Sequence, residues 1–209
     1  MLRKEIENEM QRRSILNDDF FDARQDTKTK IPNIVHYVWF GCRTFRFHHY
    51  LSMKSVINIQ KPESIFLHTN CKPSGKYFNE LEDSVTIVKR SPPDRIWDRP
   101  VEKIEHKSDV ARLQILMEHG GIYLDDDVLI LKPLTDLLEN EMVLGEENYD
   151  ALANTIILAS KDSWFLKRWY WEYRNFDDNI WSHHSCFVPW SIWHLFPDSI
   201  NVQKEKMLR

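Results

Sequence analysis

The stretch SDVARLQILMEHGGIYLDDDVLILKPL, residues 108–134, decides which fold the sequence predicts. Apolar residues at helical spacing predict a helix over residues 109–119, with Ser108 as its N-cap and Gly120-Gly121 as its stop. An apolar run then predicts a strand over residues 122–131. A helix that leads into a buried strand is typical of α/β proteins.

Three aspartates, Asp125, Asp126 and Asp127, follow the first apolar residues of that strand. Side chains two positions apart on a strand project to the same side, so we expect Asp125 and Asp127 to converge and Asp126 to face away. Two such carboxylates favour a divalent cation between them, and their hard oxygen atoms suit Mg²⁺ or Mn²⁺. A solvated turn of three acids is the alternative. A calcium loop is excluded because no D-x-D-x-D-G pattern follows.

Predicted strands and helices alternate on both sides of this stretch. Strands are predicted at residues 34–40, 64–70, 84–90, 141–147 and 153–159. Helices are predicted around Tyr50, Met53 and Ile57, over residues 76–83, and from Asp162-Ser163 onward. The alternation predicts a mostly parallel, Rossmann-like α/β sheet flanked by helices, with ligands at the carboxyl ends of the strands.

Length and composition limit the classes of protein that fit. The 209 residues suffice for one sizeable domain, which we place at residues 31–209 after a polar segment at residues 1–30. The 28 Lys and Arg against 32 Asp and Glu give a net charge of −4, so binding to nucleic acid is not expected. Only five glycines occur, and they form neither a GxGxxG turn nor a GxxxxGK[ST] phosphate loop.

Cysteines and apolar stretches give weaker signals. Cys42, Cys71 and Cys186 are an odd number at wide spacing without a CxxC pair, so we interpret them as reduced or incidental thiols. The charged N-terminus predicts no signal peptide or membrane anchor, and no stretch is apolar enough to span a membrane. Eleven aromatic residues lie between Trp164 and Trp193; we expect most in the core, with stacking on an acceptor sugar as the alternative.

The block SD..R…GGIYLD.D resembles the DXD-containing sugar-binding region of nucleotide-sugar glycosyltransferases. That family includes fungal Golgi mannosyltransferases, and the catalytic domains of large glucosylating bacterial toxins are related to it. IPNIVHYVWFG at residues 31–41 is similar to the family's first strand, and ANTIILA at residues 153–159 is similar to a later segment. The resemblance spans about residues 31–200. It implies a GT-A fold, a UDP- or GDP-sugar donor, a metal ion (Mn²⁺ or Mg²⁺) and retention of anomeric configuration.

The resemblance also implies roles for individual residues. Trp39 would stack on the donor base, Asp109 and Arg112 would contact the donor sugar, and Tyr123 and Asp125 would lie near the ribose and sugar. Asp127 would bind the metal directly, together with Asp125, and Asn154 is a candidate polar group near the sugar. The expected catalytic residues are therefore Asp109, Arg112, Asp125 and Asn154, and the expected donor-binding residues are Trp39, Asp109, Arg112, Tyr123 and Asp125.

Each assignment has a structural alternative. Trp39 lies in an apolar strand and fits a core position. Asp109 fits the first turn of a helix, and Arg112, three residues later, fits a surface residue that pairs with Asp109. Two other functions also compete with glycosyl transfer to a glycan, lipid or protein acceptor. One is a phosphatase of the haloacid-dehalogenase type, which also places DxD after a strand. The other is a truncated relative that binds nucleotide sugar without turnover.

The end of the chain departs from the family pattern. A further metal ligand or diphosphate contact lies well C-terminal of the DXD in the family, whereas this chain ends at Arg209. We therefore expect a catalytic domain truncated at its C-terminus. We expect a Golgi location if a full-length eukaryotic form carries an anchor, and a cytoplasmic one otherwise.

Overall fold

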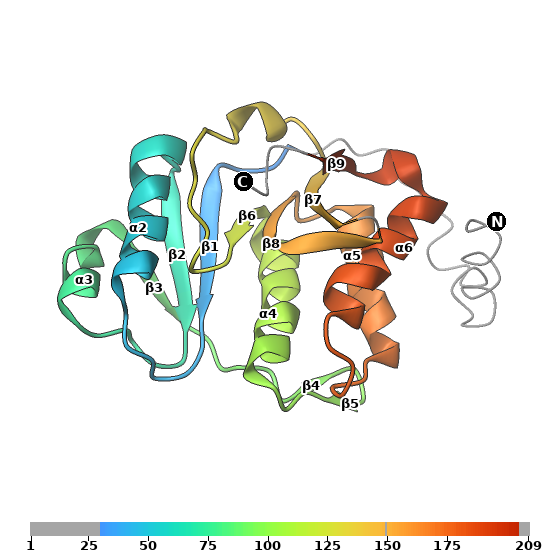
Figure 1. The fold of residues 1–209 in the computed structure, drawn as a ribbon, viewed down its shortest axis with the longest axis horizontal. Helices are drawn as coiled ribbons and strands as arrows, with labels where there is room; N and C mark the ends of the chain where they lie inside the picture. The colour runs from blue at the N-terminus through green and yellow to red at the C-terminus, as the bar shows by residue number, and fades with distance from the viewer. Residues whose placement is uncertain (1–29, 149, 205–209) are drawn as a thin grey trace.

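A computed structural model describes residues 30–148 and 150–204. The predicted polar segment at residues 1–30 lies, apart from Lys30, outside the described residues. Within them a seven-stranded sheet has the order β3-β2-β1-β6-β8-β7-β9 (Figure 1). Its strands are β1 (Ile34–Trp39), β2 (Ser64–Thr69), β3 (Thr86–Lys89), β6 (Gly121–Leu124), β7 (Met142–Asn148), β8 (Ala151–Ala159) and β9 (Asn201–Gln203).

The sheet is mostly parallel, as the sequence predicts. The pairs β1–β2, β2–β3, β1–β6 and β7–β9 are parallel, whereas β8 runs antiparallel to both β6 and β7. Since β2 and β6 lie on opposite sides of β1, the order of the parallel strands reverses between β1 and β6. Ligands of open α/β sheets bind outside the carboxyl ends of the strands at such a point.

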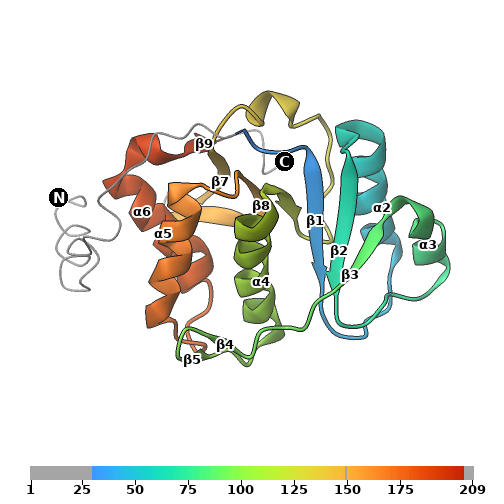
Figure 2. The same ribbon diagram turned by 180° about the vertical axis from the view of Figure 1, so that it is seen from behind.

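Helices cover both faces of the sheet (Figures 1 and 2). One face packs against α2 (Phe47–Ser55) and α3 (Lys76–Asn79), and the other against α4 (Ile104–His119), α5 (Trp164–Glu172) and α6 (Val188–Leu195). The alternation of β1 explains this arrangement: Tyr37 and Trp39 pack in the α2 cluster, whereas Val38 packs in the α4 cluster. Within the described part of the chain, no helix has the length and apolar character needed to cross a membrane.

Helix α4 begins earlier than predicted. Ser108 is not its N-cap, because the helix starts at Ile104 and the Ser108 hydroxyl donates to the Ile104 carbonyl at 3.1 Å. A contact with a distant segment stabilises the extra turn, because the His106 ring lies 2.9 Å from the Asp178 carboxylate. The predicted stop is confirmed, since Gly120 has φ 69° and ends the helix. A Cβ at Gly121, which has φ 112°, would lie 2.7 Å from the Ile34 carbonyl oxygen.

Strand β6 is shorter than predicted, because it ends at Leu124. The three aspartates therefore lie in a turn, in which the Val128 amide donates to the Asp125 carbonyl at 3.2 Å. The prediction that strand alternation sets the directions of Asp125 and Asp127 is therefore wrong. The Asp125 amide donates to the Thr155 carbonyl at 2.9 Å, which fixes the start of the turn against β8. Residues 91–100 contain a short hairpin of β4 (Arg95–Ile96) and β5 (Arg99–Pro100).

The interpretation of all three cysteines as thiols is also wrong. Cys42 and Cys71 form a disulfide, and Cys186 is a buried free thiol. The two bridged residues are 29 positions apart in sequence, but they follow the neighbouring parallel strands β1 and β2. Their Cα atoms are 5.3 Å apart because those strands end side by side. Spacing alone does not reveal this pairing.

Two buried histidines support the Gly120-Gly121 turn. His36 Nε2 donates to the Gly120 carbonyl at 3.0 Å, so His36 Nδ1 is left to accept from His68 Nε2 at 3.1 Å. His68 Nδ1 is then a buried acceptor without a hydrogen-bond partner among residues 30–148 and 150–204. Burial lowers the pKa of His36 to about 4 and that of His68 to about 3, so both rings are neutral near neutral pH.

This pair predicts acid sensitivity of the fold. Unfolded histidines take up protons below pH ~6.5, whereas the folded rings resist protonation, so the free energy of unfolding should decrease from about pH 6.5 toward pH 4. Each histidine contributes up to about 1.4 kcal/mol per pH unit. Urea unfolding across this range measures the slope. His68→Gln should flatten it, and His194→Gln, whose ring packs on Trp190 and Trp193, should not; equal slopes in all three proteins would contradict the prediction.

Candidate functional site

A cavity of about 340 Å³ opens at the carboxyl ends of β1 and β6, where the strand order reverses. Its size is within the range of small-ligand sites. The N-terminal half of α4 forms one wall, the acidic turn after β6 forms another, and β8 with residues 181–186 closes the remaining side. Six of the seven predicted site residues line it: Asp109, Arg112, Tyr123, Asp125, Asp127 and Asn154.

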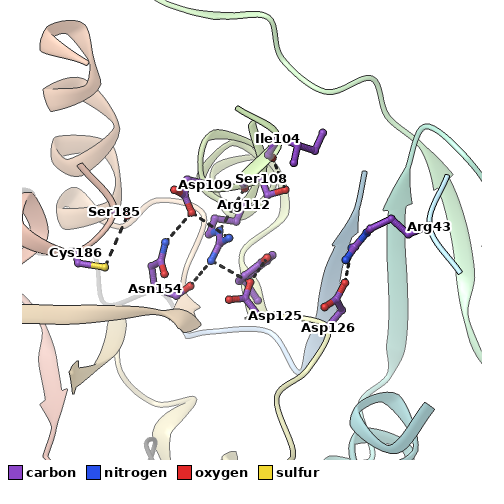
Figure 3. A network of polar contacts seen from close by, with 11 residues as sticks. Arg43, Ile104, Ser108, Asp109, Arg112, Asp125, Asp126, Asn154, Ser185 and Cys186 are labelled. Carbon is purple, nitrogen blue, oxygen red and sulfur yellow. Dashed lines mark hydrogen bonds and ion pairs between the residues drawn. The ribbon is translucent and has the colours of Figure 1, made fainter. Parts of the chain in front are cut away.

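Arg112 lies at the centre of a buried polar network (Figure 3). Its guanidinium is 3.1 Å from Oδ1 of both Asp109 and Asp125, and it donates to the Asn154 carbonyl at 2.7 Å. The same group lies 4.5 Å above the Tyr123 ring. Helix α4, the end of β6 and the start of β8 thus meet at one side chain. The interpretation of Arg112 as a surface residue is wrong, because the residue is only 5% exposed.

The two carboxylates in this network have further partners. Asn154 Nδ2 donates to Asp109 Oδ1 at 2.8 Å, and the Tyr123 hydroxyl donates to Asp125 Oδ1 at 2.7 Å. Burial raises the pKa of the Asp109 and Asp125 carboxyls, and the Arg112 charge opposes that shift. Oδ1 of each carboxylate is therefore occupied by protein donors. The other oxygen atoms are the ones available to a ligand.

Asp126 and Asp127 have different surroundings. Asp126 does not face away from the site, because it lines the cavity and forms an ion pair of 2.6 Å with Arg43. Asp127 also lines the cavity and is exposed, and it forms no hydrogen bond or ion pair within residues 30–148 and 150–204. A cation in the cavity would therefore find one free carboxylate at Asp127 and one free oxygen atom at Asp125.

Trp39 is the predicted site residue that does not line the cavity. Its side chain is fully buried, with the Arg43 guanidinium 4.1 Å from the ring centroid and the His49 ring edge-on at 4.8 Å. A nucleotide base could stack on this indole only after Arg43 moves aside. The role of Trp39 as a base platform stays a prediction.

Several cavity residues were not identified from the sequence. They are Arg43, His106, Glu147, Ser182, Ser185 and Cys186, whereas Trp181 is one of the eleven aromatic residues for which stacking on an acceptor sugar is the alternative. Arg43 follows the end of a predicted strand and Glu147 ends another, which is a signal that could have identified both. Cys186 comes from a distant segment with no local pattern. Burial raises the pKa of the Cys186 thiol to about 12, so this cysteine is not a thiolate nucleophile.

Comparison with known proteins agrees with this geometry. Residues 23–149 match the family described as glycosyltransferase sugar-binding region containing DXD motif. Glucan organizing enzyme 1 from Cryptococcus neoformans var. grubii is 32% identical over an alignment of 195 positions, which covers 84% of this chain and 53% of that protein. The chain therefore spans about half the length of this curated relative.

Solved structures of glycosyltransferases share the fold of this chain. The PaToxG glycosyltransferase superposes with a TM-score of 0.57 at 19% identity, over 93% of this chain and 78% of that one. The glycosyltransferase GlyE of Streptococcus pneumoniae TIGR4 superposes with a TM-score of 0.51 at 15% identity, over 83% of this chain and 45% of that one. The fold is the GT-A type.

Proposed function

The chain belongs to the family of glycosyltransferases whose sugar-binding region contains a DXD motif, and from that membership we propose that it transfers a sugar from a nucleoside diphosphate donor, a UDP-sugar, to an acceptor hydroxyl with retention. The observation that supports this most is the Arg112 network at the end of β6. It presents Asp109 and Asp125 side by side at the point where an open α/β sheet binds its ligand.

The reaction exchanges one bond at the anomeric carbon of the donor. The bond to the diphosphate oxygen breaks and a bond to the acceptor oxygen forms on the same face, while the acceptor proton passes to the departing diphosphate. In this scheme the free carboxylate oxygen of Asp109 accepts a hydrogen bond from a sugar hydroxyl, and the free oxygen of Asp125 is left for a cation. Arg112 acts as a positioning residue, because its guanidinium is already engaged by Asp109, Asp125 and Asn154.

A divalent cation fits one edge of this site. Asp127 and the free oxygen atom of Asp125 would hold Mn²⁺ or Mg²⁺, which when bound would neutralise charge on the diphosphate. No group of three His, Cys, Asp or Glu among the described residues could complete a metal site. The donor's phosphate oxygens and water would supply further ligands.

The disulfide bears on where the protein works. Disulfides persist in oxidising compartments and are rare in the cytosol. The Cys42–Cys71 bridge beside the site therefore supports a location in the secretory pathway, such as the Golgi, over a cytoplasmic one. The name of the fungal relative refers to glucan, so a polysaccharide is the first acceptor class to test.

Metal and nucleotide are expected to bind cooperatively. Since the diphosphate supplies ligands in addition to Asp125 and Asp127, Mn²⁺ should bind more tightly with UDP present, and by linkage UDP should bind more tightly by the same factor with Mn²⁺ present. Calorimetric titrations of each ligand with and without the other measure this coupling. Equal affinities in both titrations would mean that Asp125 and Asp127 do not hold a cation bridged to a diphosphate.

A panel of nucleotide sugars separates the competing functions on the same protein. Mn²⁺-dependent hydrolysis or transfer from a UDP-sugar supports the transferase. Binding of donor without turnover supports a non-catalytic relative, and release of phosphate from a phosphomonoester supports a phosphatase.

A further inference from the structure

Trp181 is an exposed indole on the wall of the cavity. Its side chain is 60% exposed and lines the cavity next to Ser182 and Ser185. Ser185 lies on the opposite side of Asp109 from the Arg43–Asp126 pair in Figure 3. Trp181 and the acidic turn thus come from segments far apart in the sequence and line the same cavity. An exposed tryptophan loses favourable burial, so its position calls for an explanation.

Packing does not explain the exposure of this ring. Trp169 and Trp190 of the same C-terminal segment are 1% and 6% exposed, as core residues are. Trp97, which is 46% exposed, lies edge-on to Trp171 at 5.0 Å and donates from Nε1 to the Tyr170 carbonyl at 3.2 Å. Trp181 has a single aromatic neighbour among the described residues, the His106 ring at 5.3 Å.

The segment before Trp181 is anchored to the helix that carries the site. The Asp178 carboxylate lies 2.9 Å from His106 Nδ1 and accepts from the Lys103 amide at 3.4 Å, and the Lys103 ammonium donates to the Asp178 carbonyl. His106 and Asp109 are three residues apart on α4 and so lie on the same face of the helix. The Trp181 ring lies 5.3 Å from the His106 ring, so this segment brings Trp181 beside the helix that carries Asp109.

The chemistry around the ring matches one face of a sugar. A pyranose has an apolar C–H face that packs on an aromatic ring, and hydroxyl groups that need polar partners at its edge. Ser182, Ser185 and Glu147 supply hydroxyl and carboxylate groups on this side of the cavity. A lipid chain would leave those groups without partners.

We propose that Trp181 is the platform on which the acceptor stacks, and that the acceptor is therefore a pyranose sugar. This inference rests on the proposed function, because it assigns the donor to the acidic turn and leaves the Trp181 wall to the acceptor. Trp181 then orients the acceptor ring, so that one hydroxyl faces the anomeric carbon near Asp109 and Asp125.

Saturation-transfer NMR with simple sugars tests the platform directly. The probes are the methyl pyranosides of glucose, galactose and mannose, with UDP and Mn²⁺ present. At least one should receive saturation on its C–H face from the wild-type protein. Trp181→Ala should weaken its binding on the order of tenfold, and Trp181→Phe should retain part of it. Trp97→Phe, an exposed tryptophan outside the cavity, is the matched control and should bind the pyranoside as the wild type does.

UDP affinity, measured on the same samples, separates the two proposals. Trp181→Ala should leave it unchanged, because the indole is assigned to the acceptor. The proposal is overturned if no pyranoside binds the wild-type protein, if Trp181→Ala binds the pyranoside equally well, or if it loses UDP and pyranoside affinity together. Absence of UDP binding in the wild type would contradict the donor assignment, whereas the pyranoside titrations would still decide the role of Trp181.

Discussion

Replacing Arg112 by methionine is expected to lower the free energy of unfolding by about 3–5 kcal/mol, which is a large part of the 5–15 kcal/mol typical of a domain. The guanidinium is buried between the Asp109 and Asp125 carboxylates. Its removal leaves two like charges in a poorly solvated site with no cation between them. The Asn154 carbonyl also loses its 2.7 Å donor.

Urea unfolding near neutral pH measures this loss. Arg112→Lys should lose less stability because it keeps the charge, although an ammonium cannot reproduce the fork that reaches both carboxylates. The control is Arg95→Met on the exposed hairpin, where the change should stay within about 1 kcal/mol. A loss of under ~1 kcal/mol for Arg112→Met would show that the carboxylates do not need this guanidinium.

Asp127→Asn is expected to lower sugar transfer by at least about 100-fold. Substitution of residues that only support a metal's ligands already lowers activity by about 10- to 100-fold, and Asp127 is proposed as a ligand itself. Stability should remain the same or rise slightly, because Asp127 is exposed, has no protein partner among the described residues and repels its two acidic neighbours.

Transfer assays and thermal unfolding on the same variant separate the two effects. Asp136→Asn replaces an exposed acid outside the cavity and serves as the matched control. Wild-type transfer and wild-type Mn²⁺ affinity in Asp127→Asn would remove this residue from the site.

The parts of the site that could be predicted are those with a local pattern. Asp109 and Arg112 share one helix face, and Tyr123 and Asp125 end the strand that follows, so the block at residues 108–134 places all four near one another. The resemblance added Asn154, and the structure brings it to the same network. The pattern around Trp39 does not distinguish two positions, because an apolar strand suits both a core residue and a ligand platform.

The remaining differences arise from contacts between distant segments. Helix α4 begins at Ile104, before Ser108. Its first turn is held by Asp178, which lies 72 residues from His106 along the chain. The acidic turn leaves the strand early, and its first residue bonds to Thr155 across the sheet. Trp181 reaches the cavity through the same anchored segment. None of these contacts has a signature in local spacing.

The disulfide constrains the unfolded chain as well as the folded site. Cys42 and Cys71 both precede Asp109, Arg112 and Asp125 in the chain. Their bridge joins residues 29 positions apart and restricts the unfolded chain through α2 and β2. It needs no contact from the acidic turn, because it links the ends of the neighbouring strands β1 and β2. A host that makes the protein in a reducing cytoplasm omits this bridge, so the compartment of expression determines whether the unfolded first half is crosslinked.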